Sequence, residues 1–128
     1  MAKKIFVSYN YKDSEITRTI NSMVRDCGGI IDGVFVFVEN DMSNLGERAI
    51  ESEIRKVMNQ CDAALFVVGD DCHNSPWINR EAQLAKSLGL NIVITRIPYS
   101  DGGIPYELMG NRYAFSTWSS RDLAFHFN

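Results

Sequence analysis

Short apolar runs alternate along this chain with stretches in which apolar residues recur every three or four positions. Five runs predict strands: 4–9, 34–38, 63–68, 91–97 and a short one at 112–115. Four stretches predict helices, beginning near Asp13 or Ser14, near Asn44, at Pro76 behind an N-capping Ser75, and at Ser119 or Ser120. Segment 99–110 is expected to be irregular. This alternation indicates a parallel sheet covered by helices on both faces.

The predicted fold class is therefore α/β, a three-layer fold of flavodoxin-like topology with four to five parallel strands. The length of 128 residues fits a single domain over 1–128 whose core needs no disulfide or metal. In such folds the ligand site lies beyond the carboxyl ends of the strands. That rule selects four loops: 8–13, 39–45, 69–77 and 99–103.

One carboxylate interrupts the apolar face of the helix that begins at Pro76. At about 100° per residue, the apolar residues of this helix fall within an arc of about 120°: Ile78, Leu84, Ala85 and Leu88. Glu81 lies near the middle of that arc. The opposite side is expected to face solvent: Asn79, Arg80, Gln83, Lys86 and Ser87. Carboxylates are rarely buried without a partner, so Glu81 is a structural group, an edge residue of a rotated helix, or a candidate for chemistry.

Composition and charge exclude several classes of partner. A net charge of −3 gives no electrostatic reason to expect nucleic acid or an anionic membrane surface. No apolar stretch approaches transmembrane length, and the run after Lys4 is too short for a signal peptide, so a cytoplasmic location is expected. The three cysteines, Cys27, Cys61 and Cys72, lack metal-ligand spacing, so reduced thiols and no metal site are expected.

Several phosphate-binding and phosphorylation motifs are missing. The loop after the first strand reads SYNYKD, without the glycines of a dinucleotide-binding turn, and no Walker A motif occurs. The same loop lacks the phosphate loop of a flavodoxin. A phosphoreceiver domain is disfavoured because only Asp13 stands in the first loop and the expected lysine is missing, although Asp70 and Asp71 follow the third strand.

The predicted crevice combines one carboxylate with hydroxyl, amide and aromatic side chains. A carboxylate beside a ribose can stabilise an oxocarbenium-like transition state, attack the anomeric carbon or hold ribose hydroxyls. One carboxylate without a second acid suits a leaving group that departs without protonation, such as the nicotinamide of NAD+. Trp77 or Tyr11 would offer an aromatic surface on which that ring could stack.

Two segments resemble TIR domains. KIFVSYNYKD, with Ser8, Tyr9 and Asp13, resembles the first TIR box. SPWINRE resembles the TIR segment in which a tryptophan is followed four residues later by the catalytic glutamate of NAD-cleaving members. The phrase NREAQLAKSLGLNIVITRIP looks most like compact bacterial TIR-like proteins, which include the signalling subunit of Thoeris anti-phage systems. The resemblance extends from Lys4 to about Phe115.

The resemblance implies a role for particular residues. Glu81 would be the catalytic residue, and NAD+ the substrate, with no resident cofactor. The implied substrate-binding residues are Ser8, Tyr9, Asn10, Asp41, Ser75 and Trp77. Segment 41–46 would be the loop that TIR domains use in assembly. The Pro-Gly pair of animal TIR domains is missing from it, and Phe115 and Trp118 are the nearest substitutes for the FW element of the third box.

The function expected from the resemblance is NAD+ glycohydrolase or ADP-ribosyl cyclase activity. The product would be an ADP-ribose-derived, cyclic second messenger that a separate effector reads during anti-phage defence, and activity would require self-association. Two alternatives stay open. One is a non-enzymatic TIR-like adaptor that binds partners through 40–45, and the other is an enzyme like the nucleoside deoxyribosyltransferases.

Overall fold

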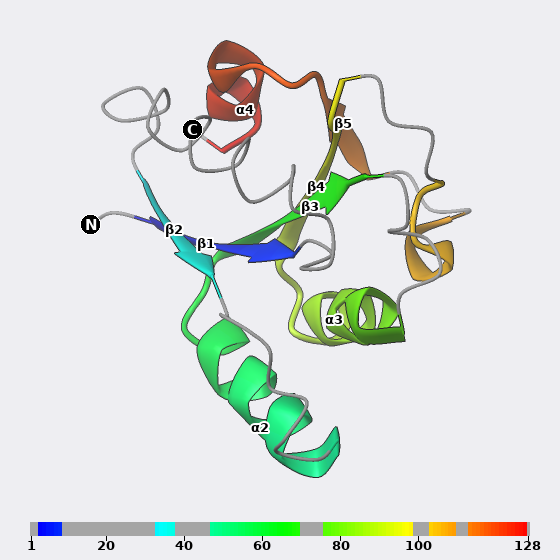
Figure 1. The fold of residues 1–128 in the computed structure, drawn as a ribbon. Helices are drawn as coiled ribbons and strands as arrows, with labels where there is room; N and C mark the ends of the chain where they lie inside the picture. Colours follow the sequence, from blue (N-terminus) through cyan, green and yellow to red (C-terminus); the bar gives the residue numbers. More distant parts are fainter. Residues whose placement is uncertain are drawn as a thin grey trace.

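The computed structural model describes residues 3–8, 33–37, 47–69, 76–98, 103–109 and 113–127. Its centre is a five-stranded sheet in the order β2-β1-β3-β4-β5, and every neighbouring pair is parallel (Figure 1). The strands are β1 Lys3–Ser8, β2 Gly33–Phe37, β3 Ala63–Val68, β4 Asn91–Arg96 and β5 Ala114–Ser116. The chain turns back between β2 and β3, so the strand order reverses between β1 and β3.

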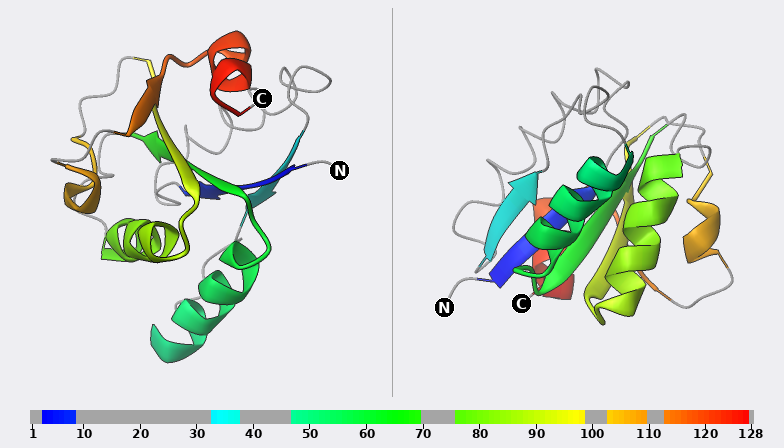
Figure 2. Two further views of the ribbon diagram at one scale, coloured as in Figure 1. Left: turned by 180° about the vertical axis from the view of Figure 1, so that it is seen from behind. Right: turned by 90° about the horizontal axis from the view of Figure 1, so that it is seen from below.

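Helices cover both faces of the sheet, as the alternation of elements predicted. Helices α2 (Glu47–Met58) and α3 (Pro76–Ser87) lie on one face and α4 (Ser120–Phe127) lies on the other (Figures 1 and 2). A short 3₁₀ helix, η2 (Tyr106–Leu108), stands beside α3. The α/β fold class with a parallel sheet in the middle layer is thus confirmed.

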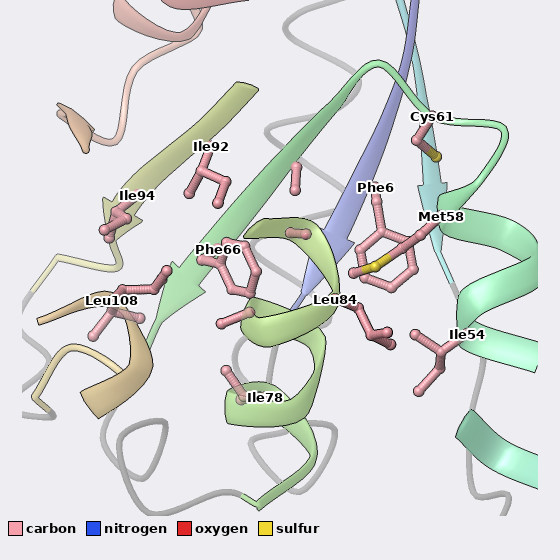
Figure 3. Packing of buried hydrophobic residues seen from close by; sticks show 14 residues of the cluster. Phe6, Ile54, Met58, Cys61, Phe66, Ile78, Leu84, Ile92, Ile94 and Leu108 are labelled. Carbon is pink, nitrogen blue, oxygen red and sulfur yellow. The ribbon is translucent and has the colours of Figure 1, made fainter. Parts of the chain in front are cut away.

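Two apolar clusters fill the space between these layers. Under α2 and α3, Phe6 and Phe66 from the sheet pack with Met58 and Ile78, all four essentially inaccessible (Figure 3). Under α4, Leu123 and Phe127 pack on the other face of the same strands. All six residues of β3 are buried. Its uninterrupted apolar run follows from its central position, because helices cover both of its faces.

Helix α3 ends in a motif that satisfies its last carbonyl groups. The Leu90 amide donates to the Ala85 carbonyl at 3.1 Å, and the Gly89 amide donates to the Lys86 carbonyl at 3.2 Å. Gly89 has a φ of 70°, in the left-handed region. This is the Schellman arrangement, in which the residue after the helix must be left-handed. The prediction that Gly89 ends the helix is confirmed.

Most predicted strand boundaries agree with the structure within one residue, and two regions differ more. The fifth strand covers Ala114–Ser116 rather than 112–115. Segment 99–110 is not wholly irregular, because it contains η2. The helix predicted after Asp13 or Ser14 lies outside the described residues.

Two further properties concern the described part of the chain. None of its helices has the length and apolar character needed to cross a membrane. Nor do any three His, Cys, Asp or Glu side chains within the described ranges gather closely enough to hold a metal ion. The buried Cys61 thiol donates to the Val57 carbonyl at 3.4 Å, and burial is the main reason that its pKa is raised.

Candidate active site

Ser8 ends β1 at the place where the strand order reverses. In the sheet it lies next to Phe66 of β3, near the carboxyl ends of both strands. Side chains alternate along a strand, so Ser8 shares the face of Phe6, which is the face that α2 and α3 cover. The Ser8 side chain is buried, with a relative exposure of 1%. On the face of the sheet that α2 and α3 cover, β1 therefore ends in a buried hydroxyl group rather than in an apolar side chain.

Glu81 lies on the buried side of α3. Its neighbours on this side are the buried Ile78, Ala82, Leu84 and Ala85, and Glu81 itself has a relative exposure of only 9%. The helical phase predicted from the sequence is confirmed. The carboxyl group is buried on the same side of the helix as the apolar side chains, close to Ser8 of the sheet.

Burial strongly affects the protonation of Glu81. Loss of hydration disfavours the charged form and raises the pKa of Glu81 from 4.5 to about 8. The nearby Ser8 hydroxyl favours the charged form and lowers the pKa by a smaller amount. At neutral pH the carboxyl group is therefore mostly protonated.

The two side chains approach each other without forming a hydrogen bond of ordinary geometry. Within the part of the chain that the structure describes, Ser8 Oγ is a buried polar atom without a hydrogen-bond partner of ordinary geometry. Such atoms are rare in folded proteins, because leaving a buried polar group unpaired costs about 1–3 kcal/mol. A polar group of a ligand could complete this pair.

Two cations of α3 are engaged with other carboxylates. Arg80, the preceding residue, pairs with Glu51 of α2 at 3.8 Å, and Lys86 pairs with Glu107 of η2 at 3.1 Å. None of the ion pairs found within the described ranges includes Glu81. A positively charged ligand could therefore act as the counter-ion of this carboxylate.

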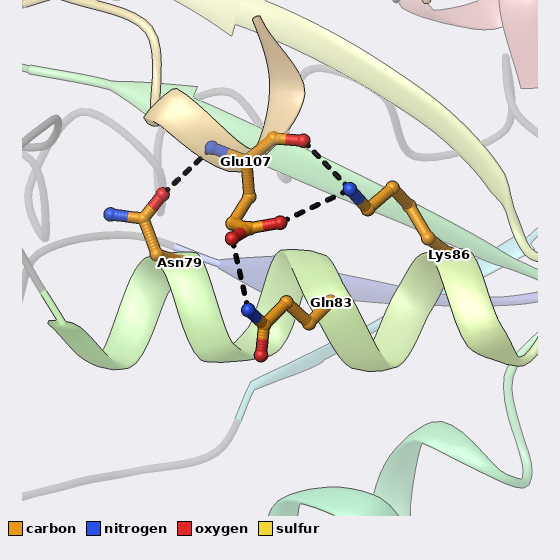
Figure 4. A network of polar contacts seen from close by, with 4 residues as sticks. All are labelled: Asn79, Gln83, Lys86 and Glu107. Carbon is orange, nitrogen blue, oxygen red and sulfur yellow. Dashed lines mark hydrogen bonds and ion pairs between the residues drawn. The ribbon is translucent and has the colours of Figure 1, made fainter.

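Part of the polar side of α3 is covered by η2, while Gln83 and Ser87 stay exposed. Asn79 Oδ1 accepts a hydrogen bond from the Glu107 amide at 3.1 Å, and Gln83 Nε2 donates to Glu107 Oε1 at 2.9 Å (Figure 4). Lys86 Nζ donates to the Glu107 carbonyl at 2.9 Å and to Oε2 at 3.1 Å. Bonds from Gln83 and then Lys86 are the main reasons that the pKa of Glu107 is lowered.

These bonds correct one expectation. Asn79 was expected to face solvent, but its relative exposure is 4%. The reason is that η2 brings a backbone amide to it from a distant part of the chain. The sequence contained no indication of this contact, because a polar helix face has the same pattern whether water or a polar segment covers it.

The other expected site residues lie at or beyond the limits of the described structure. Trp77 belongs to the first turn of α3, one turn before Glu81. Tyr9, Asn10, Asp41 and Ser75 lie outside the described residues. Of the expected set, the structure thus brings Ser8 and Glu81 together.

Comparison with known proteins identifies the family. A family model described as "TIR domain" matches residues 5–125. The chain belongs to the TIR domain family. No curated protein matches it.

A structure of the Trypanosoma brucei CTPS glutaminase domain with bound acivicin matches with a TM-score of 0.47 and 15% sequence identity. The match covers 74% of the TIR domain chain, which spans only 36% of that structure. Such a likeness says nothing about activity.

Proposed function

We propose that this TIR domain cleaves the nicotinamide–ribose bond of NAD+ and that Glu81 is its catalytic carboxylate. The observation that supports the proposal is the buried Glu81 carboxyl group beside the buried Ser8 hydroxyl, to which no described residue offers a hydrogen bond of ordinary geometry, where the strand order reverses. Ligands of open α/β sheets bind at that position. The family also includes NAD+-cleaving members.

The chemistry matches the single carboxylate. In NAD+ the nicotinamide ring is cationic, and when the ribose C1′–N bond breaks the bonding electron pair moves to the ring nitrogen. The ring leaves neutral and needs no proton. The ribose becomes oxocarbenium-like, and a neighbouring carboxylate stabilises that positive charge most strongly where water is excluded. Water or a nucleophile of the ADP-ribose itself then bonds to C1′ and loses a proton.

Substrate charge would also place Glu81 in its reactive state. The carboxyl group is mostly protonated when the site holds no cation, because its pKa is about 8. A positive charge within about 4–6 Å favours the ionised form of a carboxyl group. Binding of the cationic ring thus generates the carboxylate that the bond cleavage requires.

The remaining parts of the proposal rest on the resemblance to compact bacterial TIR-like proteins. Besides Ser8, the proposed substrate contacts are Tyr9, Asn10, Asp41, Ser75 and Trp77. NAD+ is a substrate here, and no resident cofactor takes part. The product is an ADP-ribose-derived, cyclic messenger that a separate effector reads in anti-phage defence of the Thoeris type. Self-association, which is common among TIR domains, accompanies activity.

The test is nicotinamide release from NAD+ by the wild type and by Glu81→Gln, with separation of the ribose-containing products. It is made on purified protein and on lysates of phage-infected cells, so that a required activator is present. Glu53→Gln, the same change at an exposed position of α2, is the matched control. We expect turnover to disappear only in Glu81→Gln.

Other results would support a different function. Wild-type turnover in Glu81→Gln would overturn the catalytic assignment. Transfer of deoxyribose between bases without use of NAD+ would favour a deoxyribosyltransferase, and partner capture without any turnover would favour an adaptor. If NAD+ is cleaved, the co-product separates hydrolysis from cyclisation.

A further inference from the structure

The bonds between α3 and η2 converge on a single residue. We call them the Glu107 clasp: the hydrogen bonds and ion pair that join Glu107 to Asn79, Gln83 and Lys86. The three α3 residues are spaced by four and three positions, so they form one row along the helix (Figure 4). Glu107 meets this row with its backbone amide, its backbone carbonyl and both carboxylate oxygens.

The clasp and Glu81 lie on opposite sides of the same helical turns. Glu81 stands midway in sequence between Asn79 and Gln83, two residues from each. Two residues correspond to about 200° of rotation, which places Glu81 about 160° from either. A small rotation of α3 that loosened the clasp would therefore move the Glu81 carboxyl group away from its present position beside Ser8.

The apolar face alone defines this rotation poorly. Two of the residues that α3 buries against the sheet are the small Ala82 and Ala85. Hydrophobic contact is non-directional, whereas hydrogen bonds restrict both distance and angle. On the side facing α2, Arg80 forms a partly exposed ion pair with Glu51, at 3.8 Å. Exposed pairs of this kind contribute little.

We propose that the Glu107 clasp fixes the rotation of α3 and so holds Glu81 beside Ser8. Glu107 is then a positioning residue, because it contacts the side of α3 opposite Glu81 and acts on the site only through the helix. Its importance for turnover rests on the proposed NAD+ cleavage, but its effect on the position of Glu81 does not. The clasp also ties α3 to the segment that follows β4.

In the described elements, charged groups around α3 form ion pairs with one another. They form two pairs, Glu51 with Arg80 and Lys86 with Glu107, and Glu51 also pairs with Arg55 at 3.6 Å. On β1 the neighbouring polar group is the Ser8 hydroxyl. A change in the clasp is thus expected to alter the pKa of Glu81 by changing the burial of the Glu81 carboxyl group and its distance from Ser8.

The experiment is a direct titration of the Glu81 carboxyl carbon by NMR in the wild type, Glu107→Ala and Glu51→Ala. Glu51→Ala is the matched control, because it removes an ion pair to the same helix from the other side. In Glu107→Ala we expect the pKa of Glu81 to move down toward 4.5, since a displaced carboxyl group gains water. In Glu51→Ala we expect no change.

Kinetics provide the second readout. If the domain cleaves NAD+, Glu107→Ala should lower kcat roughly 10- to 100-fold, as a misplaced catalytic group does. Glu51→Ala should retain wild-type kcat. Should Glu107→Ala not fold, Lys86→Met removes two bonds of the clasp and keeps an apolar stem, and the same downward change in the Glu81 titration is expected.

A Glu81 titration that is identical in the wild type and in the clasp variants would overturn the inference, whatever happens to turnover. A wild type that does not use NAD+ would instead overturn the proposed function, and the titration would still report the position of Glu81. A pKa that falls equally in Glu51→Ala would also overturn it, because any loosening of α3 would then suffice.

Discussion

The Ser8 hydroxyl and the Glu81 carboxyl group approach each other across the boundary between sheet and helix, and both are buried. Ser8 comes from the end of β1 and Glu81 from the helix that follows β3. Among the described residues, Glu81 takes part in none of the ion pairs, and Ser8 Oγ makes no hydrogen bond of ordinary geometry. The pair costs stability in the unliganded protein, which is typical of a functional site.

The first prediction concerns the pH dependence of folding. The pKa of Glu81 is about 8 in the folded protein and 4.5 as its ordinary value. Below pH 4.5 both states bind the proton and Glu81 costs nothing. Between these values the unfolded chain ionises while the folded one does not, so stability falls as pH rises. The loss is on the order of 3 kcal/mol at pH 7 and saturates above the folded pKa.

Urea unfolding of the wild type and of Glu81→Gln at pH 4.5, 7 and 9 measures this loss. Because glutamine does not ionise, the difference between the two proteins isolates the contribution of Glu81. We expect Glu81→Gln to gain stability relative to the wild type with each rise in pH. A difference that is the same at all three values would show that Glu81 is hydrated in the folded state.

The second prediction concerns Ser8. Ser8→Ala removes a buried hydroxyl that makes no hydrogen bond of ordinary geometry to the described residues, so it should raise the free energy of unfolding by about 1 kcal/mol. It should also raise the pKa of Glu81, because Ser8 lowers it. If the pair acts on NAD+, turnover should fall at least about tenfold while stability rises. Chemical denaturation and nicotinamide release measure the two effects.

Thr95 offers a matched control. Its hydroxyl is also buried without a hydrogen-bond partner among the described residues, and Thr95 has a relative exposure of 1%. It belongs to β4 and shares the face of Val93 and Ile97, which is the face opposite α3. Thr95→Val should therefore increase stability as Ser8→Ala does and leave turnover unchanged. Equal loss of turnover in both variants would argue against a special role for Ser8.

The sequence could predict the position of Glu81 because that position depends on local periodicity. Ile78 and Ala85 define the buried side of α3, and Glu81 lies between them in helical phase. The placement of Ser8 beside it follows from a general rule for parallel sheets, in which the carboxyl ends of the strands share one edge.

The clasp and the fifth strand could not be located in the same way. Asn79 is buried by a backbone amide 28 positions away, and no local pattern encodes that contact. Strand β5 has three residues and pairs with β4, so its register depends on the pairing of Val93 with Ala114. The apolar pattern of this strand also gives the wrong burial for Phe115, which is apolar but 58% exposed.

The third prediction concerns the end of α3. Gly89 has a left-handed φ of 70°, and no atom would obstruct an added Cβ within 4 Å. Gly89→Ala should therefore destabilise the fold by about 1 kcal/mol through backbone strain alone. Thermal unfolding measures the effect. Asparagine tolerates this conformation better than alanine, so Gly89→Asn should lose less, and an equal loss would point to a cause other than φ.

The last prediction concerns proton release on substrate binding. Near pH 7 the Glu81 carboxyl group is mostly protonated, and the cationic nicotinamide ring would favour its ionised form. Binding of NAD+ should therefore release part of a proton from Glu81. The number released should approach one at pH values between 4.5, the ordinary pKa, and about 8, the pKa in the folded protein. NADH carries a neutral ring and should release none. Calorimetric titration in two buffers of different ionisation enthalpy measures the number of protons.

Glu81→Gln provides the control, because it can bind the ring but has no proton to release. Using this variant also prevents turnover during the measurement if the catalytic assignment is right, and the wild type is then measured with a non-cleavable analogue that keeps the cationic ring. We expect release with the wild type only. Equal proton release by NAD+ and NADH would contradict a role for the ring charge, and release by Glu81→Gln would assign the proton to another group. Proton release that is confined to the wild type and the cationic ligand would identify Glu81 as the group that the positive charge of the nicotinamide ring ionises.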